Sequence, residues 1–123
     1  MRHEVTAADT ATALGSGDVP VLATPRLIAW MEAETVRITA ELLDADQTTV
    51  GTAVRIEHRR ATPVGGTVEI TATLPSDISA HRLTFSVHAV DGSGNVVATG
   101  EIDRAIVDRA RFLGTASKTD ADR

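Results

Sequence analysis

Residues 24–45 read TPRLIAWMEAETVRITAELLDA, and this stretch predicts one long helix. Thr24 is suited to the N-cap, and Pro25 then occupies the first helical position, where its fixed φ and missing N–H cost nothing. At helical spacing, one stripe carries Ile28, Met31, Thr35, Thr39 and Leu42. We therefore expect a helix that ends within residues 44–48 and packs this stripe against the core.

The segments around this helix are expected to form strands. Residues 3–9 suit a short strand, and residues 10–23 suit a helical turn and a loop. Segments that alternate apolar and polar residues follow the helix at 49–61, 67–74, 81–90 and 95–109. In the first of these, one face is expected to carry Val50, Thr52, Val54, Ile56 and His58. In the third, the residues expected to point inward are Leu83, Phe85, Val87 and Ala89.

Turn signals join most of these segments as hairpins, the strongest being Asp91-Gly92-Ser93-Gly94. Hairpins make a sheet antiparallel, and one helix on one face of it gives an α+β architecture. This layout is similar to the hotdog fold, in which a sheet of about five strands wraps one long central helix. We expect one such domain over residues 1–113 and a disordered tail over residues 114–123.

Composition narrows the possible functions. The 123 residues suit one domain, and 42% of them are hydrophobic, enough for a compact core. Aromatic residues make up only 2%, so we expect an oligomer interface to add to a small core. A formal net charge of −5 argues against nucleic acid or an anionic membrane as the main partner. The chain has no cysteine, membrane-span pattern or signal-peptide pattern, so we expect a cytoplasmic protein without disulfides or a thiolate metal site.

Three polar residues stand out by their positions. Glu32 lies next to Met31 on the core-facing stripe, where a carboxylate is costly unless it is paired or functional. His58 lies on the apolar face of its strand, and Thr24 lies at the helix N-terminus, where the helix dipole favours negative charge. Each has an ordinary structural explanation: a glutamate reaching solvent, a satisfied histidine near a strand end, and a helix cap. The catalytic interpretation requires all three to converge.

The spacing of these residues resembles that of the fluoroacetyl-CoA thioesterase family of hotdog enzymes. In that family a Thr precedes a helix Glu by eight residues, and a His follows the Glu by 26, which here gives Thr24, Glu32 and His58. Gly51, within the segment TVGT, lies seven residues before the His. The pattern A-T-P-x-G-x-x-V that follows the His is present at residues 61–68. The resemblance runs from about Val5 to Phe112, nearly the whole folded chain.

The resemblance implies an acyl-CoA substrate, no cofactor or metal, and a homodimer with its sites at the subunit interface. Glu32 would be the nucleophile, through an anhydride, or the base for a water, and His58 would move protons. Thr24 would orient Glu32 or the substrate. Gly51 or N–H groups of the helix N-terminus would contact the carbonyl, and Arg60 would meet the phosphates of CoA. We expect the carboxyl group of Glu32 and the imidazole of His58 to converge on one pocket.

One feature departs from the family. The fluoroacetyl-specific member closes its pocket with an aromatic residue just before the helix, but Asp18 stands at about that position here. Residues 1–29 contain no Phe, Tyr or Trp. Among the remaining charges, Arg55 and Arg59 suit a solvated outer strand face, and Arg104 suits mixed charge on a strand rim.

The sequence thus predicts a thioester hydrolase that cleaves a small acyl-CoA to the free acid and CoA. Two alternatives stay open. One is a hotdog enoyl-CoA hydratase, which also uses an acid and a histidine, and which hydration of an enoyl-CoA without CoA release would support. The other is a non-catalytic protein that binds acyl-CoA or a small ligand, which tight binding without turnover would support.

Overall fold

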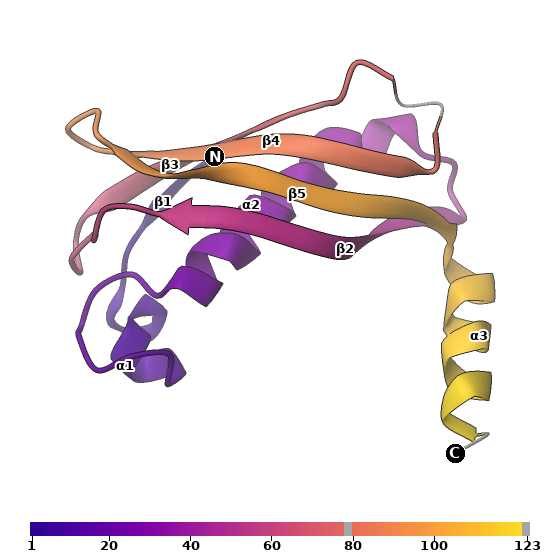
Figure 1. The fold of residues 1–123 in the computed structure, drawn as a ribbon, viewed down its shortest axis with the longest axis horizontal. Coiled ribbons are helices and arrows are strands. Elements are labelled where there is room, and N and C mark those ends of the chain that lie inside the picture. The colour runs from indigo at the N-terminus through magenta and orange to yellow at the C-terminus, as the bar shows by residue number, and fades with distance from the viewer. Residues whose placement is uncertain (78–79, 122–123) are drawn as a thin grey trace.

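The computed structural model describes residues 1–77 and 80–121, in which one long helix lies against an antiparallel sheet (Figure 1). In chain order the elements are β1 (Arg2–Glu4), η1 (Ala7–Asp9), α1 (Ala11–Leu14), α2 (Thr24–Thr39), η2 (Ala40–Leu42), β2 (Gln47–His58), β3 (Thr67–Thr73), β4 (Arg82–Asp91), β5 (Val96–Asp108) and α3 (Arg109–Ala121). The sheet has the order β1-β3-β4-β5-β2, and each neighbouring pair is antiparallel. The predicted α+β architecture of one central helix and about five strands is confirmed.

The core lies between α2 and the sheet. The inward-facing set predicted for residues 81–90 is confirmed, because all four of its members are buried: Leu83, Phe85, Val87 and Ala89. Met31 of the predicted helix stripe is fully buried, as expected. Ile28 of the same stripe is only half-buried, and Leu27 is the buried residue beside Met31 in the core. Burying a large apolar side chain contributes about 1.5–3 kcal/mol relative to leaving it exposed, so these contacts fix α2 on the sheet.

The helix begins and ends differently from the prediction. Its N-cap is Ala23 rather than Thr24, and no side chain caps it. Thr24 is therefore the first helical residue, and Pro25 follows it. At the other end, α2 stops at Thr39, and the tighter turn η2 rotates Leu42 away from the stripe and leaves it 51% exposed.

A bulge in β2 changes which residues face the helix. The pairing of β2 with β5 shifts by one residue between Gly51 and Ala53, which leaves Thr52 as the extra residue. Directly opposed residues share a face of the sheet, and Gly51 opposes Arg104. Before the bulge, the odd-numbered residue Gly51 therefore faces α2. Beyond the bulge, the even-numbered residues of β2 face α2. The prediction that Val50 shares the face of His58 is wrong for this reason.

The chain beyond β5 forms α3 where the sequence predicts a tail from Gly114. The carboxylate of Asp108 accepts a hydrogen bond from the backbone N–H of Arg111 at 2.9 Å, which is the usual role of an N-cap. The structure thus has a helix over 114–121 where the sequence predicts a tail, and residues 122–123 lie outside the described residues. α3 extends away from the sheet, at the end opposite α1 (Figure 1). Neither α3 nor any other helix in the described part of the chain is long and apolar enough to cross a membrane.

Candidate active site

A polar pair joins the start of α2 to the end of β2. Thr24 Oγ1 and His58 Nδ1 lie 2.7 Å apart, a normal hydrogen-bond distance. Because Ala23 occupies the N-cap position, the Thr24 hydroxyl is not needed for capping. The structure therefore brings together two of the three residues predicted to be catalytic.

His58 has one nitrogen engaged and one free. Its Nε2 is buried and has no hydrogen-bond partner among the residues that the structure describes. Burial lowers the pKa of His58 below the ordinary value of 6.5, and the backbone of Arg60 opposes this in part. At neutral pH the imidazole is therefore mainly neutral, with one donor and one acceptor nitrogen. Since Nδ1 contacts Thr24, Nε2 is the ring nitrogen that is not engaged by a side chain of the described residues.

A pocket of about 290 Å³ adjoins this pair. One wall is the end of β2 with the residues that follow it, and the other is the loop that precedes α2. The loop contributes only small or aliphatic side chains, namely Ser16, Gly17, Val19, Val21 and Leu22. Asp18, which is expected at about the position of the aromatic lid of the fluoroacetyl-specific member, does not line it. The pocket is therefore not closed by a ring.

Glu32 belongs to a second polar cluster, centred on Arg104. Arg104 Nη1 donates to Glu32 Oε2 at 3.0 Å, and the Arg104 side chain is 8% exposed while that of Glu32 is 37% exposed. A Cβ atom on Gly51 would lie 2.7 Å from Glu32 Oε2, so glycine is what allows β2 to pass this carboxylate. The interpretation of Arg104 as a rim charge is wrong. Its alternation with Ile102 and Ile106 is the sequence signal that places it on the inner face.

Glu32 and His58 do not meet within one chain. Glu32 follows Thr24 by eight residues on α2, which at about 1.5 Å per residue separates their Cα atoms by about 12 Å. Glu32 also lies beside Gly51, seven residues before His58 on β2, a separation of roughly 20 Å along a strand. The pocket at His58 accordingly has no contribution from Glu32. The expected convergence on one pocket is not observed in the single chain.

The arginines near His58 have different surroundings. Arg60 lines the pocket, is 57% exposed, and contacts Asp91 only loosely, at 3.5 Å from its Nε. Arg55 pairs instead with acidic residues of β5, with Nη2 at 2.8 Å from Asp103 Oδ1. Arg59 pairs with Glu57 at 2.8 Å. The prediction of a solvated outer face for Arg55 and Arg59 fits these surface ion pairs, and Arg60 is the cation left at the pocket.

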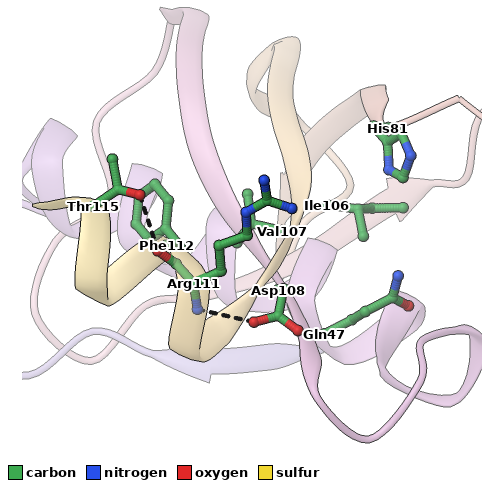
Figure 2. A pocket seen from close by; sticks show the side chains of 8 residues that line it. All are labelled: Gln47, His81, Ile106, Val107, Asp108, Arg111, Phe112 and Thr115. Carbon is green, nitrogen blue, oxygen red and sulfur yellow. Dashed lines mark hydrogen bonds between the residues drawn. The ribbon is translucent and has the colours of Figure 1, made fainter.

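A larger pocket, of about 420 Å³, lies at the base of α3 (Figure 2). It is lined by Gln47, His81, Ile106, Val107, Asp108, Arg111, Phe112 and Thr115. None of the residues predicted to be functional contributes to it. Size alone therefore does not identify the reactive site, which is better identified by the buried, unpartnered nitrogen of His58.

The sequence matches the model of the fluoroacetyl-CoA-specific thioesterase family over residues 5–110. The chain belongs to this family. A curated relative, the fluoroacetyl-CoA thioesterase of Streptantibioticus cattleyicolor, is 36% identical over 92 residues. The alignment covers 75% of this chain but spans only 65% of the length of that relative.

Solved structures agree with this membership. A variant of the fluoroacetyl-CoA-specific thioesterase, in complex with fluoroacetate and CoA, is 28% identical with a TM-score of 0.88, covering 97% of this chain and 96% of that chain. A hypothetical thioesterase-superfamily protein from Thermus thermophilus, 21% identical, has a TM-score of 0.89 over 99% of this chain and 89% of its own. The hotdog fold expected from the sequence is confirmed.

Proposed function

We propose that this protein is an acyl-CoA thioesterase, which hydrolyses a small acyl-CoA to the free acid and CoA. The observation that carries the proposal is the hydrogen bonding of His58. The chain that contains this histidine belongs to a thioesterase family. The Nδ1 of His58 is held by Thr24, its Nε2 is buried without a side-chain hydrogen-bond partner among the described residues, and the residue lines a pocket. A neutral imidazole in this state is able to take a proton from water, and the imidazolium so formed is able to give that proton to a departing thiolate.

The active site is proposed to form between two copies of the chain, because Glu32 is too far from His58 to act with it in one copy. β2 is an edge strand, paired with β5 on one side only, so its other edge is open to a second strand. Antiparallel pairing of two β2 strands about a two-fold axis near Arg55 sets Gly51 of one copy opposite His58 of the other, to within about one residue. That arrangement carries Glu32, which lies beside Gly51, toward Thr24 and His58 of the second copy.

The chemistry then divides among the three residues. Glu32 attacks the thioester carbonyl, or removes a proton from a water that attacks it. His58, once it has taken up a proton that originates from the water, supplies the proton that the thiolate of CoA takes. The Thr24 hydroxyl fixes which nitrogen of the imidazole faces the substrate. In total, one water and one thioester give one carboxylic acid and one thiol, without a cofactor or a metal.

The pocket also suggests how the substrate is held. Arg60 lies at its rim with only a loose acidic partner, so its guanidinium is available to the phosphates of CoA. Gly51 is proposed to let the thioester approach the inner face of β2. Since small and aliphatic side chains replace an aromatic lid, we propose that the acyl group is not restricted to fluoroacetyl. The proposed partners are acyl-CoA and a second copy of the chain, with neither nucleic acid nor membrane, in the cytoplasm.

CoA release from a panel of short acyl-CoAs, including acetyl- and fluoroacetyl-CoA, tests this proposal. The comparison uses the wild type, Glu32→Gln and Glu41→Gln, the last being a matched control because Glu41 is exposed on η2. We expect turnover by the wild type and the control, and about a hundredfold or greater loss in Glu32→Gln, as is typical for a catalytic proton-transfer group or nucleophile.

Two outcomes contradict the thioesterase function, and a third contradicts the role of Glu32. Hydration of an enoyl-CoA without release of CoA indicates the hydratase alternative. Binding of acyl-CoA without turnover, unchanged in Glu32→Gln, indicates a ligand-binding protein. Equal turnover by all three proteins removes Glu32 from the reaction.

A further inference from the structure

Arg104 is a buried cation whose hydrogen bonds hold it between β2 and α2. Its Nε donates to Thr49 Oγ1 at 3.0 Å, and its Nη2 donates to the backbone carbonyl of Thr49 at 3.0 Å. Its Nη1 donates to Glu32 Oε2, also at 3.0 Å. With 8% of the side chain exposed, the guanidinium has little freedom to turn elsewhere. One end of this fork is therefore anchored on β2 and the other is aimed at Glu32.

The local backbone is built around this ion pair. The bulge at Thr52 turns Gly51 toward α2, directly opposite Arg104. A Cβ atom at Gly51 would lie 2.7 Å from Glu32 Oε2 and 3.3 Å from Arg104 Nη1. The missing side chain thus leaves the space that the carboxylate and the guanidinium occupy.

We propose that Arg104 is a positioning residue that fixes Glu32 for attack and then stabilises it as the departing carboxylate, an inference that rests on the proposed thioesterase function. Oε2 of Glu32 is engaged by Arg104, so Oε1 is the oxygen presented to the thioester. A lysine is unable to replace this fork, because a single ammonium does not reach Thr49 and Glu32 together with planar geometry.

The two half-reactions place different demands on Arg104. In the first, Oε1 attacks the carbonyl carbon and the C–S bond breaks, which releases CoA as a thiolate and leaves an acyl-Glu32 anhydride. In the second, water adds to the acyl carbon and gives a proton to the neutral imidazole of His58, and the imidazolium so formed passes that proton through solvent to the thiolate. The bond between the acyl carbon and Oε1 then breaks, and Glu32 leaves as a carboxylate. Arg104 stabilises that negative charge, so its loss slows the second half-reaction more than the first.

This difference gives Arg104 a signature that a purely structural residue lacks. When breakdown of the anhydride becomes slow, acyl-enzyme accumulates and CoA appears in a burst before the steady state. A residue that only supports the fold would lower the melting temperature or the fraction of active protein, without adding an acyl group to Glu32.

The test compares full-length Arg104→Lys and Thr49→Val with Arg37→Lys, a control on α2 whose exposed guanidinium pairs with Glu34. Each protein is mixed with the best acyl-CoA from the panel, quenched in acid, and examined by intact and peptide mass spectrometry. We expect Arg104→Lys to show a CoA burst, an acyl group on the Glu32 peptide, and about a tenfold or greater loss of kcat. Thr49→Val should change in the same direction by less, because the carbonyl of residue 49 still accepts from Arg104.

Two results would overturn the assignment. One is a kcat of Arg104→Lys that equals the kcat of Arg37→Lys, and the other is a loss of kcat without an acyl adduct. If Arg104→Lys does not fold, the same criteria apply to Thr49→Val. A wild type that releases no CoA from any substrate removes the thioesterase proposal itself, a result distinct from either failure of Arg104.

Discussion

Replacing Gly51 with alanine tests the geometry at Glu32 with one methyl group. The added Cβ would lie 2.7 Å from Glu32 Oε2, about 0.7 Å inside the 3.4 Å at which ordinary van der Waals contact begins. The carboxylate is the far end of a flexible side chain, so it moves aside rather than unfolding the sheet. A shift of this size at a reacting group costs kcat about tenfold to a hundredfold, since misplacement by about 1 Å costs up to about 10²-fold.

The assay is kcat for CoA release, measured beside the melting temperature. Gly114→Ala is the matched control, because a Cβ there meets no atom within 4 Å. We expect Gly51→Ala to keep a melting temperature close to that of the wild type and to lose activity, and Gly114→Ala to keep both. Wild-type kcat in Gly51→Ala would refute the idea that the position of the Glu32 carboxylate determines the rate.

Three further predictions concern the His58 pocket. Thr24→Val removes the hydroxyl that contacts His58 while keeping a similar shape, so kcat should fall about tenfold or more. Thr24→Ser keeps a hydroxyl and should retain activity. Similar rates for the two variants would contradict this prediction. Because burial lowers the pKa of His58, the midpoint at which kcat/KM falls on acidification should lie below pH 6.5. A midpoint above 6.5 would show a histidine that is protonated more easily than its burial implies. Arg60→Gln should raise KM for acyl-CoA severalfold with little change in kcat. Arg59 pairs with Glu57, so Arg59→Gln should leave KM unchanged. Equal KM values for the two variants would show that Arg60 does not bind CoA.

The alternation of apolar residues predicts the sheet well where one face is clearly buried. Residues 81–90 alternate without interruption, and all the residues predicted to point inward are buried. A strand of this kind has one register that buries its apolar set, so the pattern is sufficient to orient it. The same reasoning fails in β2, because the bulge at Thr52 inserts a residue that leaves no mark in the alternation of small and β-branched side chains.

The spacing of residues in the sequence predicts part of the candidate site. The other part depends on tertiary contacts that the sequence does not show. The pairing of Thr24 with His58 follows the predicted set, but Thr24 has a different local role, since Ala23 takes the N-cap. Arg104 was missed because a charged residue near the end of a strand usually faces solvent. Its burial depends on acceptors supplied by Thr49 and Glu32, which are distant in sequence and which no local pattern connects to it.

The central claim is that each site combines Glu32 of one copy with His58 of another, and subunit mixing tests it most directly. Glu32→Gln and His58→Asn should each be inactive as homodimers. After subunit exchange, verified by native mass spectrometry, a mixed dimer contains one site with both substitutions and one with neither. We expect activity to return to roughly a quarter of the wild-type level for random mixing of a two-fold dimer. Mixed dimers that form but stay inactive would contradict a shared site.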